Sequence, residues 1–190
     1  MNELFSSVYH QVSGLGASAL LGTILTLTAV FPAAAQQPPE QTTRELTLDA
    51  GSLTHLHSRM GGGQLVVEGV DGATAIVVSA NIFYYDEADI SLSLESINDE
   101  ARLEAGFIGG DYSGVAPYMD VTIRVPKHFS VDVRHGDGDI QVHNLDAMLT
   151  LESGVGDIDV NNVAGVYIEH RSGGRVSTKN IHGPVRIRQR

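Results

Sequence analysis

Three stretches near the C-terminus repeat one pattern at a spacing of 18 residues: 138–145, 156–163 and 174–181. Each begins with glycine, carries an aliphatic residue two positions later, and has asparagine four positions after that. A fixed period with several matching columns is typical of proteins in which each coil covers the apolar face of its neighbour. The sequence therefore predicts a parallel β-solenoid with coils of about 18 residues.

The matching columns predict what each residue type does in such a stack. Residues one coil apart lie roughly 4.8 Å from each other, so like residues form ladders. Glycine is expected at corners where a side chain would clash or φ is positive, and asparagine at corners where its amide can bond to the coils above and below. The predicted ladders are Gly138/Gly156/Gly174, Ile140/Ile158/Val176 and Asn144/Asn162/Asn180.

Each coil also carries a second strand, marked by two apolar residues at alternate positions. The third pair lies one residue earlier than strict spacing requires, which we interpret as one residue moved from the turn before the strand to the turn after it. The pairs are Val131/Val133, Leu149/Leu151, Val166/Ile168 and Val185/Ile187.

The middle of the chain has the alternation of β-strands. Residues 63–72 match the C-terminal repeat and predict an early coil. The segments 75–85, 90–94, 102–107 and 120–125 alternate with period two between short turns, which predicts an antiparallel strand region inserted before the solenoid. Because no segment after the leader has a sustained helical period, we expect the domain to be all-β.

The N-terminus has the pattern of a secretory signal. The apolar run 15–35 ends in three alanines before Gln36, which predicts a signal peptide over 1–35. An uncleaved membrane anchor is the alternative, because the run carries no Lys or Arg and is long enough to span a bilayer. We expect a disordered spacer over 36–43 and a single domain over 44–190.

Composition and charge exclude several classes of site and partner. The chain has no cysteine, which excludes disulfides and thiolate sites. Residues 36–160 hold 21 acidic and 6 basic side chains, whereas 161–190 hold one acidic and six basic. The acidic body argues against nucleic acid, and membrane contact is expected only through an uncleaved leader. The basic tail 186–190 is expected to protect an exposed sheet edge.

The chain resembles a family of bacterial envelope proteins known as the putative adhesin domain, whose function is not established. The most specific part of the resemblance is the run 123–133, with its Val125-Pro126 step, followed by repeats of the form Gly-x-Ile-x-Val. It covers about 45–190 and implies an extracytoplasmic β-solenoid, which in some relatives is linked to envelope stress. The resemblance implies a periplasmic, cell-surface or secreted protein.

Two groups of side chains are candidate metal ligands. Stacking of the coils would gather carboxylates at one glycine-rich corner, as in calcium-binding β-rolls, although the nine-residue motif of those rolls is absent. These residues are Asp137, Asp139, Asp157 and Asp159. Separately, His55 and His57 lie two apart and would share one face of a strand, where they could bind a metal with a third ligand that no spacing identifies. Solvated turn carboxylates and surface histidines are the alternatives.

Tyrosines near the longest irregular loop, 109–119, are candidate contact residues. Loop tyrosines bring area and a hydroxyl group at low entropic cost. These are Tyr84, Tyr85, Tyr112 and Tyr118. The alternative is that these rings cover the junction between the inserted strands and the solenoid.

The sequence predicts a non-catalytic protein without a cofactor. It contains no nucleophile elbow, His-Glu-x-x-His motif or phosphate loop. We therefore expect a module that binds an envelope protein or a cell-surface polymer, and the family resemblance implies a role in adhesion or envelope stress. The alternatives are a structural protein that stacks head to tail and a β-helix enzyme that acts on polysaccharide.

Overall fold

The computed structural model describes residues 38–109 and 114–190 of the chain. The predicted leader, with both the signal-peptide and the anchor alternative, lies outside these residues. Within them, no helix is long and apolar enough to cross a membrane. The first strand begins at Glu40 and pairs residues 40–43 with 81–84, so the prediction of a disordered spacer over 36–43 is wrong for that part.

The described residues form strands and one short 3-10 turn, so the all-β prediction is confirmed. In chain order the elements are β1 (Glu40–Asp49), β2 (His55–Gly62), β3 (Leu65–Val70), β4 (Ala75–Tyr84), η1 (Glu87–Asp89), β5 (Ile90–Ile97), β6 (Glu100–Phe107), β7 (Tyr118–Pro126), β8 (Ser130–Asp137), β9 (Ile140–Val155), β10 (Ile158–His170), β11 (Val176–Ile181) and β12 (Val185–Gln189).

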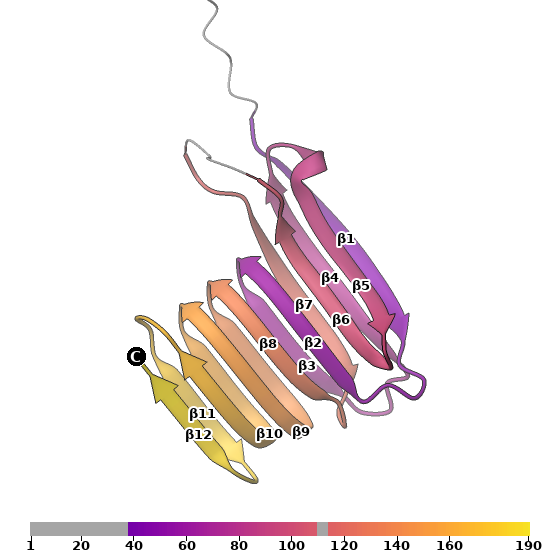
Figure 1. Cartoon of the computed structure of the whole chain (residues 1–190), viewed down its shortest axis with the longest axis vertical. Helices are drawn as coiled ribbons and strands as arrows, with labels where there is room; N and C mark the ends of the chain where they lie inside the picture. Colours follow the sequence, from indigo (N-terminus) through magenta and orange to yellow (C-terminus); the bar gives the residue numbers. More distant parts are fainter. Residues whose placement is uncertain (1–37, 110–113) are drawn as a thin grey trace, which may run out of the picture. The chain divides into compact units, whose positions relative to one another are not determined.

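These strands lie in two rows that face each other (Figure 1). One row contains β1, β4, β7, β3 and β11, and the other contains β5, β6, β2, β8 and β12. The long strands β9 and β10 belong to both rows, because their first halves pair with β3 and β11 and their second halves with β8 and β12. The sheet therefore folds over along β9 and β10.

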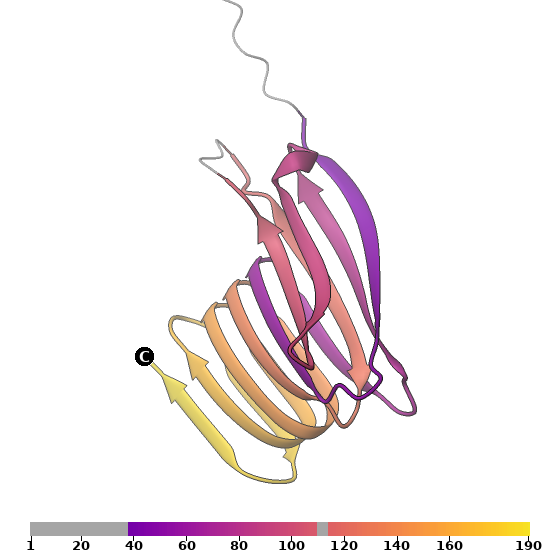
Figure 2. The same cartoon turned by 45° about the vertical axis from the view of Figure 1, so that its right-hand side comes forward.

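The architecture corrects the prediction of a parallel solenoid. The sheet is mixed, since β1–β4, β4–β7 and β5–β6 pair antiparallel, and it nearly closes on itself like a flattened barrel (Figure 2). Parallel stacking at the predicted spacing occurs within this sheet, across β9, β10 and β11. The repeat predicts how equivalent residues of successive coils stack, but it does not predict how the other strands pair. A prediction from the period alone therefore made too much of the sheet parallel.

The predicted ladders are present where β9, β10 and β11 pair. Ile158 lies opposite both Ile140 and Val176 in the strand register. In the second strand of each coil, Val166 pairs with Leu149 and with Val185, which confirms the one-residue displacement. Each fully buried aliphatic side chain of this kind contributes about 1.5–3 kcal/mol.

The glycine ladder marks a tight corner, as predicted. Gly138, Gly156 and Gly174 have φ of 132°, 127° and 114°. A Cβ atom on Gly156 would lie 2.2 Å from the carbonyl oxygen of Gly138, closer than two such atoms can approach. Glycine is therefore needed here both for backbone conformation and for the close approach of successive coils.

The asparagine ladder is confirmed at its first two positions and differs at the third. Asn144, Asn162 and Asn180 all have positive φ, and Asn162 Nδ2 donates to Asn144 Oδ1 at 2.9 Å. Asn180 instead donates to Asn161 Oδ1 at 2.9 Å, and Asn162 Oδ1 lies 3.1 Å from His182 Nε2. The last coil is therefore tied to the sheet by a different pair of side chains.

The inserted strands continue the main sheet and do not form a separate antiparallel region. β7 pairs antiparallel with β4 on one side and parallel with β3 on the other, and β6 likewise joins β5 to β2. The predicted early coil is confirmed, because Leu65 and Val67 of β3 pair in parallel with Ile140 and Val142 of β9.

The core fills the space between the two rows. Successive side chains of a strand point to opposite faces of the sheet, so every second side chain points inward. The apolar side chains that point inward from the two rows pack together. Fully buried members from both rows include Leu56, Leu65, Ile76, Ile123, Phe129, Val131, Ile140, Leu149, Ile158 and Ile168. The outward positions of every strand are thereby free to form surface sites.

Candidate functional site

The outer face of β1, β4 and β7 carries polar and aromatic side chains near the end of β4. The antiparallel register places Asn81 of β4 between Thr43 of β1 and Asp120 of β7, and it places Phe83 opposite Tyr118. These side chains line a shallow groove of about 570 Å³. We call this surface the β4 groove, and its outward-facing residues are Gln41, Thr43, Asn81, Phe83, Tyr118 and Asp120.

Aromatic rings form one end of the β4 groove. The rings of Phe83 and Tyr118 are stacked, with centroids 5.2 Å apart and planes inclined by 16°. Tyr85 meets Phe83 edge-on at 5.8 Å, and its hydroxyl donates to the carbonyl oxygen of Val115 at 2.9 Å. Because 37 % of Tyr118 is exposed, the stacked pair presents ring surface to solvent while its partners hold it in place.

Polar groups continue the groove along the same face. Thr43 Oγ1 donates to Asn81 Oδ1 at 2.9 Å, which fixes the amide and leaves its N–H groups as donors. Asp120 Oδ1 accepts from the backbone N–H of Gln64 at 2.8 Å. Amide and carboxylate groups held in fixed positions beside stacked rings can pair with hydroxyl groups of a ligand.

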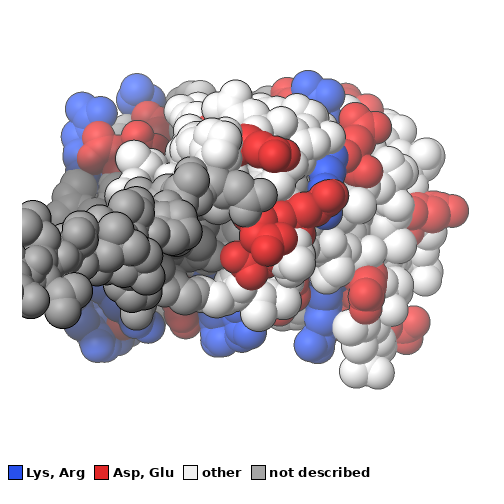
Figure 3. Space-filling model, turned by 90° about the horizontal axis from the view of Figure 1, so that it is seen from above, with Lys and Arg blue, Asp and Glu red and all other residues white. Residues whose placement is uncertain are grey.

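Acidic side chains lie close to this end of the sheet. η1 carries Glu87 and Asp89, and Glu87 forms a 2.6 Å ion pair with Arg44 of β1. Viewed onto this end, the part of the surface that is not grey shows acidic groups near the centre and along the right-hand side, and basic groups mostly along the upper and lower edges (Figure 3). The chain's formal net charge is −11. An anionic polymer is therefore a poor partner for this end of the molecule.

The structure separates the predicted tyrosines. Tyr118 belongs to the β4 groove, and Tyr85 supports its aromatic end. Tyr84 points inward and is buried, with its hydroxyl donating to Glu40 Oε2 at 2.9 Å, and this hydrogen bond raises the pKa of Tyr84. Tyr112 lies outside the described residues.

Sequence reasoning missed most of the β4 groove. Asn81, Phe83 and Asp120 are outward positions of strands, but only the pairing of β4 with β7 shows that they are neighbours. Period-two alternation could have assigned each of them to an outer face. It could not have paired them, because the register joins segments about forty residues apart in the sequence.

The predicted aspartate corner does not gather its carboxylates into a metal site in the described part of the chain. Asp139 Oδ1 accepts from the backbone N–H of Asp157 at 2.8 Å, and Asp157 Oδ1 accepts from that of Arg175. Asp157 also forms an ion pair with the Arg175 side chain, at 3.7 Å. Asp137 is exposed, and Asp159 lies on β10 opposite Gln141. Asp139 and Asp157 thus cap backbone groups of the next coil.

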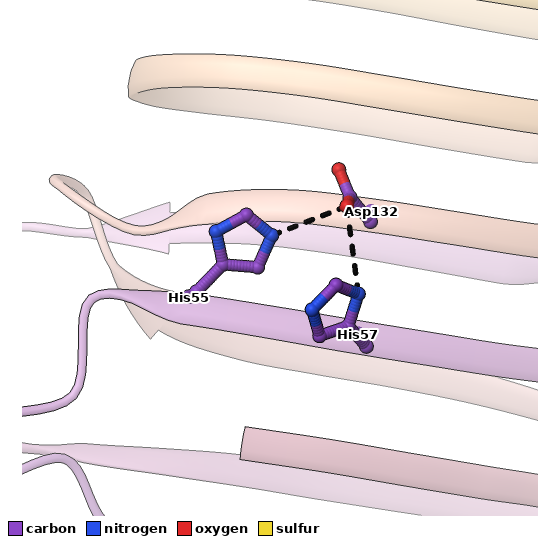
Figure 4. A group of neighbouring side chains, drawn as sticks. All are labelled: His55, His57 and Asp132. Atoms are coloured by element: carbon purple, nitrogen blue, oxygen red, sulfur yellow. Dashed lines mark ion pairs between the residues drawn. The ribbon is translucent and has the colours of Figure 1, made fainter. Parts of the chain in front are cut away.

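His55 and His57 share the outer face of β2, as predicted, with ring centroids 4.5 Å apart. The structure adds the third residue that the sequence could not supply, Asp132 of β8 (Figure 4). This group lies in the row opposite the one that carries the β4 groove.

Comparison with known proteins finds no matching family model and no matching curated protein. A "putative cell adhesion protein" from Clostridium sporogenes is 13% identical over 80% of this chain and 100% of its own, with a TM-score of 0.49. A "putative adhesin" from Bacteroides fragilis is 13% identical, with coverages of 78% and 97% and a TM-score of 0.29. One from Parabacteroides distasonis is 12% identical, with coverages of 79% and 77% and a TM-score of 0.34. All three of these bacterial proteins have adhesion in their names, at identities of 12–13% to this chain.

Proposed function

We propose that this chain is a non-catalytic binding module of the cell envelope that holds a neutral cell-surface polysaccharide in the β4 groove. The observation that supports this proposal is the stacked pair Phe83–Tyr118 beside the fixed polar groups of Asn81 and Asp120. Export follows from the predicted signal sequence over 1–35, and reading the N-terminal residue of the protein recovered from the envelope tests it.

The chemistry of the groove matches that of a sugar chain. A sugar ring has an apolar C–H face, which packs on an exposed aromatic ring, and hydroxyl groups at its edge that both donate and accept hydrogen bonds. The Asn81 amide supplies donors and the Asp120 carboxylate supplies acceptors. A groove that is open along a sheet face suits an extended polymer better than a small molecule, which is normally enclosed.

Protein partners are less favoured by this surface. The centres of protein interfaces are depleted in charged residues and rely on large apolar anchors that become fully buried. The β4 groove has one exposed aromatic pair among amide, hydroxyl and carboxylate groups. Its composition therefore supports a hydroxyl-rich ligand.

The proposal is tested by binding the full chain to a panel of neutral and anionic polysaccharides. We expect saturable binding to a neutral polymer, weakened about 10-fold or more by Tyr118→Ala, which corresponds to about 1.4 kcal/mol. Tyr167→Ala is the matched control, because Tyr167 lies on β10, away from the groove, and contacts Arg186. No binding across the panel, or equal loss in both variants, contradicts the proposal.

The enzyme alternative is tested in the same panel. We expect no cleavage products after long incubation with the polymers that bind. Release of fragments that is abolished by Asp120→Asn would replace the binding module with a polysaccharide-acting enzyme.

Self-assembly is a second candidate function, supported by the open edge at β11 and β12. Within the described residues, both strands pair only with β10, and Val185 and Ile187 are 50% and 41% exposed. Unpaired strand edges can join another chain, and the six basic residues of 161–190 complement the acidic body. Light scattering at high protein concentration across a salt series tests this. A monomer at low salt rules out stacking.

A further inference from the structure

A second group of polar side chains lies on the opposite row, on the outer face of β6, β2 and β8. The parallel register places His57 opposite Asp132 on one side and opposite Arg102 on the other. His55 lies two residues before His57 on the same face. Asp132 therefore approaches both histidines (Figure 4).

The three side chains place one donor atom each close to a common point. His55 Nε2 lies 3.2 Å from Asp132 Oδ2, and His57 Nδ1 lies 3.4 Å from the same oxygen. All three donor atoms lie within 4.8 Å of one another. In a tetrahedral zinc site with bonds of about 2.0–2.1 Å, two ligand atoms lie about 3.3 Å apart. The two nitrogen–oxygen distances agree with this value.

Both nitrogen–oxygen distances are longer than a short charge-assisted hydrogen bond. A charge-assisted hydrogen bond from a ring N–H to a carboxylate is about 2.7–2.9 Å long, shorter than either distance here. The Nε2 atom of His55 is buried and has no hydrogen-bond partner, although Asp132 is near it. A buried ring nitrogen that is aimed at a carboxylate without bonding to it is suited to a metal ion between them.

We propose that His55 Nε2, His57 Nδ1 and Asp132 Oδ2 bind one divalent ion of the zinc class. Two imidazole nitrogens and one carboxylate oxygen are donors that Zn²⁺ prefers, and Ni²⁺ and Cu²⁺ compete for the same set. Three protein ligands leave a coordination position for water or for a donor group from outside. The proposal rests on no assumption about the ligand of the β4 groove.

Glu100 of β6 supports this arrangement as a positioning residue. Its Oε2 atom lies 3.2 Å from His57 Nε2, the ring nitrogen that does not face Asp132. A carboxylate at this place favours the tautomer with the proton on Nε2, which leaves Nδ1 free to bind a metal. Arg102 Nη2 lies 3.6 Å from the same oxygen of Glu100 and helps to hold the carboxylate in place. His57 thus has a carboxylate beside its second ring nitrogen, as metal-binding histidines of zinc proteins commonly have.

The site is open to solvent and borders a second groove. The side chains of His55, His57 and Asp132 are 32%, 39% and 37% exposed, so an ion can reach them without movement of the backbone. The neighbouring groove, of about 290 Å³, continues over Arg134 and Glu152. A metal-bound ligand would therefore have charged groups of both signs beside it.

The test is isothermal titration calorimetry of the full chain, free of any histidine tag, with a zinc salt alone. We expect one ion per chain and loss of saturable binding in His57→Ala and in Asp132→Asn, which keeps the shape of the side chain. His143→Ala is the matched control, because His143 is an outward residue of β9 and should leave binding unchanged. No saturable binding by the natural chain, or equal binding by all variants, overturns the proposal.

Two further readouts separate metal binding from a structural role of the same residues. Co²⁺ should give visible absorption bands in the natural chain that disappear in His57→Ala, while circular dichroism without metal shows that the variant is folded. Glu100→Gln should weaken zinc binding about 10–100-fold, with partial recovery in Glu100→Asp. Glu104→Gln on the same strand is its control, since Glu104 pairs with Arg59. Equal affinities in the Glu100 and Glu104 variants would contradict the positioning role.

Discussion

Asn162 donates a hydrogen bond from Nδ2 to Oδ1 of Asn144 at 2.9 Å, and both residues have left-handed backbone, with φ of 57° and 63°. The bond links β10 to β9 at the bend where each strand passes from one row of the sheet to the other. One side chain thus stabilises both a backbone conformation and the contact between successive coils.

Asn162 should be sensitive to substitution in two separable ways. Asn162→Gly keeps the positive φ but removes the hydrogen bond to Asn144 and the contact with His182, and each lost hydrogen bond costs about 0.5–1.5 kcal/mol. Asn162→Ala also leaves the left-handed backbone to a residue that has a Cβ atom but no amide to stabilise this conformation. We expect this to lower the free energy of unfolding by about 1–2 kcal/mol more. Urea unfolding of the two variants measures the difference. Equal stabilities would show that the backbone conformation contributes nothing.

The glycine corner should tolerate substitution far less than an open turn. Gly156→Ala places a Cβ 2.2 Å from the Gly138 carbonyl oxygen at a φ of 127°, so we expect a loss of about 4 kcal/mol or more, or failure to fold. Gly173→Ala is the control, because its φ is 48° and nothing lies within 4 Å of the added atom, so its cost should be about 1–2 kcal/mol. Thermal unfolding distinguishes them, and similar costs would argue against close contact between the coils.

His135 should make stability depend on pH. The side chain is buried, and burial lowers the pKa of His135 from its ordinary value of 6.5, against smaller opposing effects of the Gly63 backbone and the Asp137 carboxylate. The unfolded chain then binds more protons than the folded chain as pH falls below 6.5, so the free energy of unfolding decreases in that direction.

The pH effect is measured by chemical unfolding between pH 7.5 and pH 5. His135→Leu removes the titrating group and should reduce the loss of stability on acidification. His128→Leu, which changes a histidine of the turn before β8, is the control and should leave the natural slope. The same slope in the natural chain and in His135→Leu would show that His135 is not the group responsible.

Substitutions of Tyr84 and Tyr118 should have different effects, one on stability and the other on binding, although both residues were predicted to contact a ligand. Tyr84→Phe removes the hydroxyl that donates to Glu40, so it should lower the unfolding temperature and leave polysaccharide binding unchanged. Tyr118→Ala should do the reverse, because the ring lies at the surface of the β4 groove. If Tyr84→Phe weakened binding without changing stability, the inward placement of Tyr84 would be contradicted.

The sequence predicted the stacking of the repeated segments in β9, β10 and β11. Ile140 over Ile158, and Asn144 with Asn162, follow from spacing because neighbouring coils are also close in sequence. The closure of the sheet was not predictable, since β4 joins β7 and β2 joins β8 across long gaps in the sequence, and no local pattern shows which distant strands pair. The solenoid prediction was therefore right about stacking and wrong about architecture.

The same limit explains the candidate sites. His55 and His57 were found because two residues on one strand share a face, whereas Asp132 lies 75 positions after His57 and reaches it only through the pairing of β2 with β8. Of the four predicted aspartates, only Asp139 and Asp157 stack, and their carboxylates accept hydrogen bonds from backbone N–H groups of the next coil.

The most direct test of the proposed binding module is an NMR titration of the isotope-labelled full chain with the neutral polysaccharide that gives the strongest binding. The account predicts that backbone amide shifts change mainly at 41–43, 81–83 and 118–120, on β1, β4 and β7. Shifts confined to β2, β6 and β8, or no shifts at a saturating polymer concentration, would contradict it.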